Sequence, residues 1–179
     1  LAKHRTMKLK HIFISLCAVI LLAACAAKPG VSPDTSSAES GDELFAKAEK
    51  LFNARAYDEA AALYDEYFSR YADKPLAAAA LMKIGIIHAL SGDYDNARAA
   101  YRKIASEYPS SSFVPDALVE DLFTYFQEGR YQDVIELAPG ILQRIDSETH
   151  IFRIHTLLGD TYMAMGSPID AIDYYARAR

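Results

Sequence analysis

Apolar positions recur along this chain with a helical period and divide it into paired segments. From residue 81 to residue 109 an amphipathic segment, a Gly-Asp turn, a second amphipathic segment and a proline follow one another. This order predicts a helical hairpin, in which a short turn joins two antiparallel helices. One hairpin cannot bury its apolar face alone, so we expect further hairpins to pack on it.

Equivalent residue types recur at an offset of 37 residues, which indicates a structural repeat. Small residues occupy the position where the two helices of a hairpin should cross, except in the third repeat, where it is Leu122. The repeat signature comprises Ala48, Gly85 and Gly159, then Tyr57, Tyr94 and Tyr131, and then Ala60, Ala97 and Ala171. A set of large residues, Tyr64, Tyr101 and Tyr175, shares this register and has Ala138 in its third place.

The pattern predicts an all-α solenoid of about four helical hairpins and does not favour a strand anywhere. Ser40 and Glu43 have the spacing of a capping box, which would begin the first helix. Pro139, inside a predicted helix, should kink or break it after Ala138. The expected pairs span about 42–54 with 58–71, 76–90 with 94–107, 114–128 with 131–145, and 149–164 with 168–179.

The start of the chain has the pattern of a secretory leader, with Met7 as the expected first residue. Basic residues precede 13 apolar-rich residues, 12–24, which are too few for a hydrocarbon core of about 30 Å. A short apolar run of this kind predicts a signal peptide. Its last residues, Leu22-Ala23-Ala24-Cys25, resemble the bacterial lipobox, although a plain signal cut near Ala27 is an alternative.

The lipobox resemblance implies cleavage before Cys25 and acylation of its thiol and new amino terminus. Residues Ala26 and Ala27 lack the aspartate that retains such lipoproteins at the inner membrane, so the resemblance implies the periplasmic face of the outer membrane. We therefore expect a signal peptide at 1–24, a lipidated cysteine and flexible linker at 25–40, and a repeat domain at 41–179. Ser, Pro, Gly and Asp dominate the linker, which is typical of a flexible tether.

Charge and cysteine content narrow the function further. Removal of the leader takes away four of the 19 Lys and Arg, which leaves 15 against 24 Asp and Glu and a net charge of −9. An acidic surface argues against nucleic-acid binding, which depends on basic residues to neutralise phosphates. Cys17 would leave with the signal and Cys25 would carry lipid, so no thiol remains for a disulfide, a metal or a nucleophile.

The best-preserved hairpin resembles a tetratricopeptide repeat. The resemblance rests on Leu81, Ile84, Gly85, His88, Gly92, Tyr94, Ala97, Tyr101 and Pro109. The extended repeat and its Tyr108-Pro109-Ser110 ending are similar to those of periplasmic lipoproteins of the outer-membrane barrel-assembly type. This resemblance implies a right-handed superhelix whose first helices line a concave, protein-binding face.

The groove that the resemblance implies is apolar, with Phe and Met prominent. Its expected residues are Phe45, Glu49, Phe52, Met82, Ile86, Leu90, Val119, Phe123, Phe126 and Met163. An amphipathic helix or an extended segment with apolar anchors would suit such a groove. If the outward positions are misassigned by one residue, several of these side chains belong to the core instead.

No motif for catalysis, a cofactor or a metal is present in the sequence. Asp93, Asp95 and Asn96 resemble the opening of a calcium loop, but the glycine and distal glutamate of that loop are missing, which favours turn and capping roles. Glu120 and Asp121 are adjacent and therefore point apart, which favours a solvated face over a catalytic pair. We expect no enzyme activity and no cofactor.

The expected function is that of a lipid-anchored periplasmic scaffold that binds envelope proteins, contacts the membrane only through its lipid, and does not bind nucleic acid. Two alternatives remain open from the sequence. The repeats could be the amino-terminal part of a longer lipoprotein that activates a peptidoglycan synthase, or an accessory domain of an envelope enzyme beyond Arg179. No polar capping helix follows the last expected helix. We therefore expect either that the sequence is a fragment of a longer chain or that a partner covers the last apolar face of the solenoid.

Overall fold

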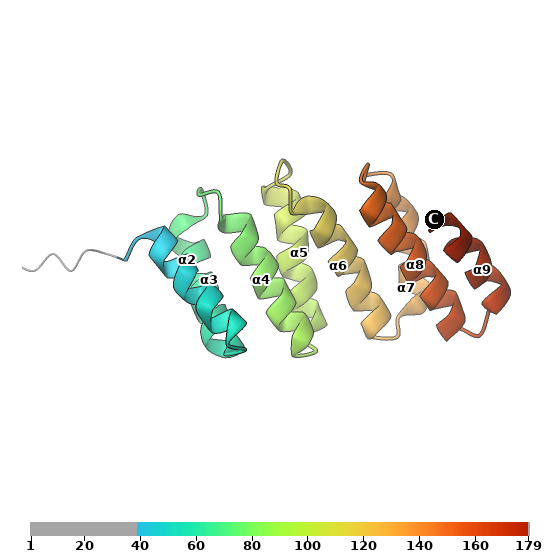
Figure 1. Cartoon of the computed structure of the whole chain (residues 1–179), viewed down its shortest axis with the longest axis horizontal. Helices are drawn as coiled ribbons and strands as arrows, with labels where there is room; N and C mark the ends of the chain where they lie inside the picture. Colours follow the sequence, from blue (N-terminus) through green and yellow to red (C-terminus); the bar gives the residue numbers. More distant parts are fainter. Residues whose placement is uncertain (1–38, 179) are drawn as a thin grey trace, which may run out of the picture. The chain divides into compact units, whose positions relative to one another are not determined.

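A computed structural model describes residues 39–178, and these residues form eight α-helices and no strand (Figure 1). The helices are α2 (Gly41–Asn53), α3 (Tyr57–Tyr71), α4 (Ala77–Leu90), α5 (Tyr94–Glu107), α6 (Val114–Gln127), α7 (Tyr131–Leu142), α8 (Glu148–Ala164) and α9 (Pro168–Arg177). The expectations for Met7, the signal peptide, Cys25 and most of the linker lie outside the described residues. The prediction of an all-α solenoid of four hairpins is confirmed.

Each helix packs on the next one in chain order, and α6 also contacts α8 directly. The helices therefore alternate between a first member of each hairpin (α2, α4, α6 and α8) and a second member (α3, α5, α7 and α9). Tyr57, Tyr94 and Tyr131 of the repeat signature each begin a second helix. This alternation makes α6 and α8 neighbours on one side of the fold.

The ends of the helices follow from local hydrogen bonding. The Ser40 backbone N–H donates to Glu43 Oε2 at 2.9 Å, and the Glu43 N–H donates to Ser40 Oγ at 3.3 Å, which is the predicted capping box. Gly92, Gly129 and Gly166 turn three hairpins with φ between 74° and 78°. Arg55 occupies the equivalent turn of the first hairpin at φ 60°, a left-handed conformation that glycine adopts more easily.

Small residues allow the two helices of a hairpin to cross closely. A Cβ added to Gly85 would lie 2.4 Å from the ring of Tyr101, and one added to Gly159 would lie 2.4 Å from the ring of Tyr175. Each ring therefore covers the backbone of the opposite helix. The signature residues Ala48, Ala60, Ala97 and Ala171 are also fully buried.

The third hairpin reverses this arrangement. Leu122 stands where the other repeats have a small residue, and Ala138 stands where they have tyrosine. Both are fully buried in the same hydrophobic cluster. The exception at Leu122 is therefore an exchange of large and small residues that conserves the filled volume.

Of the kink or break predicted after Ala138, the break is wrong. Helix α7 continues through Pro139 and Gly140, both exposed, and ends at Leu142 instead of 145. Proline lacks the N–H that would donate within the helix, and the helix ends within its next turn, so few backbone hydrogen bonds depend on this position. The proline shortens the helix without interrupting it.

The tight crossing predicts opposite effects for two Gly→Ala substitutions. Gly85→Ala forces a methyl group against the buried ring of Tyr101 and should lower the free energy of unfolding by about 1–3 kcal/mol. Gly140→Ala meets no heavy atom within 4 Å and should raise it by about 0.5 kcal/mol through helix propensity. Urea denaturation followed by circular dichroism measures both. Equal effects of the two substitutions would contradict the crossing geometry.

Candidate functional site

Two adjacent hollows open along the first helices and share the residues Glu120 and Phe123. The hollow between α6 and α8 has a volume of about 250 Å³, and the hollow between α4 and α6 has a volume of about 530 Å³. We call the two together the groove. The first hollow is lined by Val119, Glu120, Phe123, Phe152, Arg153, Thr156, Leu157 and Asp160. The second is lined by Ile86, Ala89, Leu90, Ser91, Gly92, Tyr94, Tyr101, Glu120, Phe123 and Gln127.

Exposed apolar side chains give the groove its character. Phe123 is 38% exposed, and its ring stacks on Phe126 with centroids 6.0 Å apart. Phe126 is half-buried and packs in turn on Tyr131 at 5.6 Å, so the ring of Phe123 is supported from behind. Phe152 of α8 and Leu90 of α4 are 50% and 61% exposed. The groove therefore presents apolar surface that is held in place by packing beneath it.

Ion pairs join the two walls of the smaller hollow. Arg153 of α8 donates to Asp116 Oδ1 at 3.2 Å and to Glu120 Oε1 at 2.5 Å, both on α6. His150 Nε2 lies 3.1 Å from the same Asp116 oxygen. These contacts fix the spacing of α6 and α8. Asp160, which lies on α8 like Arg153, accepts a hydrogen bond from the Tyr175 hydroxyl at 2.7 Å.

The structure places the predicted groove residues in three different environments. Ile86, Leu90, Val119 and Phe123 line the hollows. Val119 is only 3% exposed although it lines the smaller hollow, whereas Met82 is 9% exposed and lines neither hollow, so the expectation that Met82 faces the groove is wrong. Met163 is exposed but lines neither hollow. Met82, Ile86 and Leu90 are spaced four residues apart on one face of α4, so the packing of neighbouring helices, and not the helical period, decides which of them stay exposed.

The predicted residues of the first repeat are engaged by the fold itself. Phe45 packs edge-on against Tyr64 and Tyr67, with centroids 5.6 and 5.3 Å apart, and Phe52 packs against Tyr57 at 5.6 Å. These contacts correct the prediction that Phe45 and Phe52 project freely into a groove. The cause is the tyrosine-rich helix α3, which covers their rings.

Glu49 is likewise bound within the fold. It accepts a hydrogen bond from the Tyr64 hydroxyl and forms a salt bridge with Lys83 of α4, whose Nζ lies 3.2 Å from Glu49 Oε1. The same ammonium lies 4.2 Å from the centroid of the Phe52 ring. The first repeat therefore contains a bound lysine at Glu49, which the sequence predicted as a groove residue.

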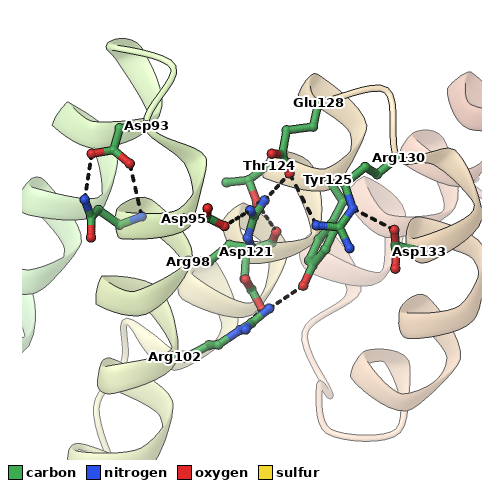
Figure 2. Close-up of polar contacts among 11 residues, drawn as sticks. Asp93, Asp95, Arg98, Arg102, Asp121, Thr124, Tyr125, Glu128, Arg130 and Asp133 are labelled. Carbon is green, nitrogen blue, oxygen red and sulfur yellow. Dashed lines mark hydrogen bonds and ion pairs between the residues drawn. The ribbon is translucent and has the colours of Figure 1, made fainter.

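A polar network between α5 and α6 is the main feature that the sequence analysis missed (Figure 2). Arg98, which is only 4% exposed, donates to Glu128 Oε2 and Asp95 Oδ1 at 2.5 Å each and to Thr124 Oγ1 at 3.3 Å. Figure 2 shows its guanidinium surrounded by these three acceptors. The 37-residue register could have indicated this network, because the position of Arg98 is apolar in the other repeats, where it is Ala61, Ile135 or Ile172.

Arginines also surround the ring of Tyr125. The guanidinium carbons of Arg98 and Arg130 each lie 4.7 Å from its centroid. Arg102 donates to the Tyr125 hydroxyl at 2.5 Å and to Asp121 Oδ2 at 3.1 Å (Figure 2). The network coincides with the boundary between two hydrophobic clusters, one over residues 44–117 and the other over 118–158. Polar contacts therefore join the second repeat to the third.

Glu120 and Asp121 point apart, as the sequence predicted, but the prediction that they belong to a solvated face is wrong. Glu120 pairs with Arg153 of α8, and Asp121 pairs with Arg102 of α5. Asp121 is buried, and its Oδ1 has no hydrogen-bond partner within residues 39–178. Burial raises the pKa of Asp121 above its ordinary value, although Arg102 opposes the shift.

The capping prediction for the second hairpin is confirmed. Asp93 is the N-cap of α5, and its Oδ1 accepts from the Asn96 backbone N–H at 3.4 Å. The carboxylate also lies 3.2 Å from His88 Nδ1. Within residues 39–178, no group of three or more His, Cys, Asp or Glu is placed to hold a metal ion. None of the helices in this range combines the length and hydropathy needed to cross a membrane.

The fold is that of a helical-repeat protein built from stacked helical hairpins. Residues 45–112 match the sequence model of the tetratricopeptide repeat family. A sequence comparison with curated proteins gives no match.

Solved structures share the fold at low sequence identity. A structure titled "MamA MSR-1 C2" has 17% identity and a TM-score of 0.59, with 80% of this chain and 77% of that chain covered. A second, titled "Crystal structure of MamA", has 15% identity and a TM-score of 0.62, with 78% and 77% covered. MamA from Desulfovibrio magneticus RS-1 has 16% identity and a TM-score of 0.62, with 79% and 75% covered. At these identities the likeness establishes the fold.

Because Asp121 is buried, we expect the free energy of unfolding to depend on pH. A carboxyl group whose pKa is raised in the folded state binds more protons than in the unfolded chain, so ionisation weakens the fold. The ordinary pKa of an aspartate side chain is 3.8, and that of Asp121 is raised above it. As the pH rises from 3.8 through the raised pKa, the free energy of unfolding of the wild type should fall relative to that of Asp121→Asn. Urea denaturation of both proteins between about pH 4 and pH 7 measures the difference. A difference that stays constant, or that moves in favour of wild type, would contradict this assignment.

Proposed function

We propose that this protein is a non-catalytic scaffold that binds a segment of another protein in the groove over α4, α6 and α8. The observation that carries the proposal is Phe123, an exposed aromatic side chain between two hollows, supported by Phe126. Exposed rings with packed support are typical of interface anchors, because they offer a large apolar area at little further entropic cost. The match to the tetratricopeptide family supports the same class of function.

The arrangement of the groove, more than its size, favours a protein segment over a small molecule. The smaller hollow, of about 250 Å³, falls below the range of about 300–1,000 Å³ that is usual for small-molecule pockets, and the larger hollow, of about 530 Å³, falls within it. Two neighbouring hollows on successive first helices instead suit two side chains of one helix or extended segment. Phe123, shared by both hollows, would lie between these side chains.

We further propose that a lipid on Cys25 anchors the scaffold to the periplasmic face of the outer membrane. The basic start, the short apolar run and the Leu22-Ala23-Ala24-Cys25 ending support this location. The partners would then be envelope proteins, and the scaffold would act in cell-envelope biogenesis, as its resemblance to barrel-assembly lipoproteins implies. A lipid anchor would hold the groove near membrane-inserted or newly exported partners.

The groove is tested by removing its exposed rings. Phe123→Ala combined with Phe152→Ala should lower the yield of crosslinked partners at least about tenfold, because anchor residues contribute about 2 kcal/mol or more each to an interface. Leu137→Ala is the matched control, since Leu137 is 40% exposed on α7, outside the groove. Mass spectrometry of in-cell crosslinks measures the yields. Unchanged capture by the double variant would refute the groove as the binding site.

The anchor is tested independently with Cys25→Ser. The wild-type protein, expressed with its own leader in a Gram-negative host, should fractionate with the outer membrane, and the variant should lose this association. Two acyl signals give stable anchoring, whereas a flexible tether alone contributes no membrane affinity. Membrane fractionation and mass measurement of the amino-terminal peptide provide the readout. An unmodified wild-type cysteine would exclude the lipoprotein assignment while leaving the groove untouched.

A further inference from the structure

We propose that the segment bound in the groove carries a lysine or arginine next to its apolar anchor, and that this cation pairs with Asp160. This inference rests on the proposed function and specifies the chemistry of the partner. It follows from a carboxylate that has no salt bridge within residues 39–178 and lies beside exposed aromatic rings, and from the equivalent carboxylate of the first repeat, which binds a cation.

The smaller hollow carries more acidic than basic charge. Asp116, Glu120 and Asp160 face it or border it, and Arg153 is the basic side chain in its lining. Arg153 is already shared between Asp116 and Glu120, and His150 also contacts Asp116. Asp160 is exposed and forms no salt bridge with any residue from 39 to 178. A ligand that enters the hollow therefore meets a carboxylate that is not paired with any cation among residues 39–178.

The first repeat shows how such a carboxylate is satisfied. Glu49 and Asp160 are equivalent positions three repeats apart, and so are Tyr64 and Tyr175. In both repeats the tyrosine hydroxyl donates a hydrogen bond to the carboxylate. In the first repeat, the carboxylate also binds an ammonium group.

That ammonium group belongs to Lys83, a side chain from the neighbouring first helix. Its Nζ lies 3.2 Å from Glu49 Oε1 and 3.3 Å from Oε2, and 4.2 Å from the centroid of the Phe52 ring. Charge pairing and a cation–π contact both stabilise this position. The position equivalent to Phe52 is Met163, so the two sites share the carboxylate and its tyrosine but not the aromatic ring. A cation from a bound segment would pair with Asp160 as Lys83 pairs with Glu49.

The surroundings of Asp160 favour a cation that is carried on a peptide. Phe123 and Phe152 line the same hollow, so the aliphatic stem of a lysine or arginine can lie along apolar surface while its charged end reaches the carboxylate. A free metal ion would leave the rings uncovered, and an anionic lipid headgroup would be repelled by Asp160 and Glu120. An amphipathic segment with one basic and one apolar position satisfies both features.

The test uses two synthetic helical peptides that share a Leu and Phe face and differ only in carrying Lys or Glu at the polar positions. The wild-type chain should bind the Lys peptide more tightly than the Glu peptide. Asp160→Asn should weaken binding of the Lys peptide about fivefold, the upper range for a partly exposed ion pair, and leave the Glu peptide unchanged or slightly strengthened. Isothermal titration calorimetry provides the affinities.

Two further variants separate a specific pair from general attraction to an acidic protein. Asp65→Asn removes the same charge from an exposed position on α3 outside the groove and should leave the preference for Lys intact. Tyr175→Phe removes the hydroxyl that binds Asp160 but keeps the carboxylate, so the preference should persist. Equal losses with Asp160→Asn and Asp65→Asn would overturn the inference.

The design also separates this inference from the proposed function. If Phe123→Ala abolishes binding of both peptides and the wild type does not distinguish Lys from Glu, the groove stands and the cation pairing is refuted. If the wild type binds neither peptide, or if Phe123→Ala changes nothing, the groove itself fails and the inference fails with it.

Discussion

The close crossing of the two helices in each hairpin is the constraint on which the rest of this structure depends. At Gly85 and Gly159 the absence of a Cβ allows a tyrosine ring to lie directly on the backbone of the opposite helix. Leu122 and Ala138 achieve the same filling with the sizes exchanged. Because protein interiors are close-packed, a hairpin that meets this constraint has little freedom in its crossing geometry. Successive hairpins can then stack in one register.

That register decides which way each side chain of a first helix faces. Glu120 and Asp121 are neighbours in sequence, yet one pairs forward with Arg153 of α8 and the other backward with Arg102 of α5. The first helix of a repeat therefore contacts both adjacent repeats and still leaves one stripe uncovered. Phe123 lies on this stripe, which is why the groove forms between first helices.

The junction between the second and third repeats carries a charged network beside its apolar contacts. Arg98 is buried among three acceptors, and Tyr125 lies between two guanidinium groups (Figure 2). Buried ion pairs add little net stability, because desolvation offsets much of their attraction, but leaving one partner unpaired is costly. The network therefore disfavours any other alignment of α5 on α6. It holds the two hydrophobic clusters in a defined register without merging them.

The sequence by itself determined the four hairpins, the capping box at Ser40 and the sites of close crossing, because these depend on local spacing and residue size. It also indicated the apolar stripe that contains Phe123. Only the tertiary structure decided which stripe residues remain accessible. The tyrosines of α3 cover Phe45 and Phe52, and Lys83 neutralises Glu49, through contacts between helices that periodicity does not encode. Exposure is a property of the assembled neighbours, whereas helix formation is largely a property of the segment.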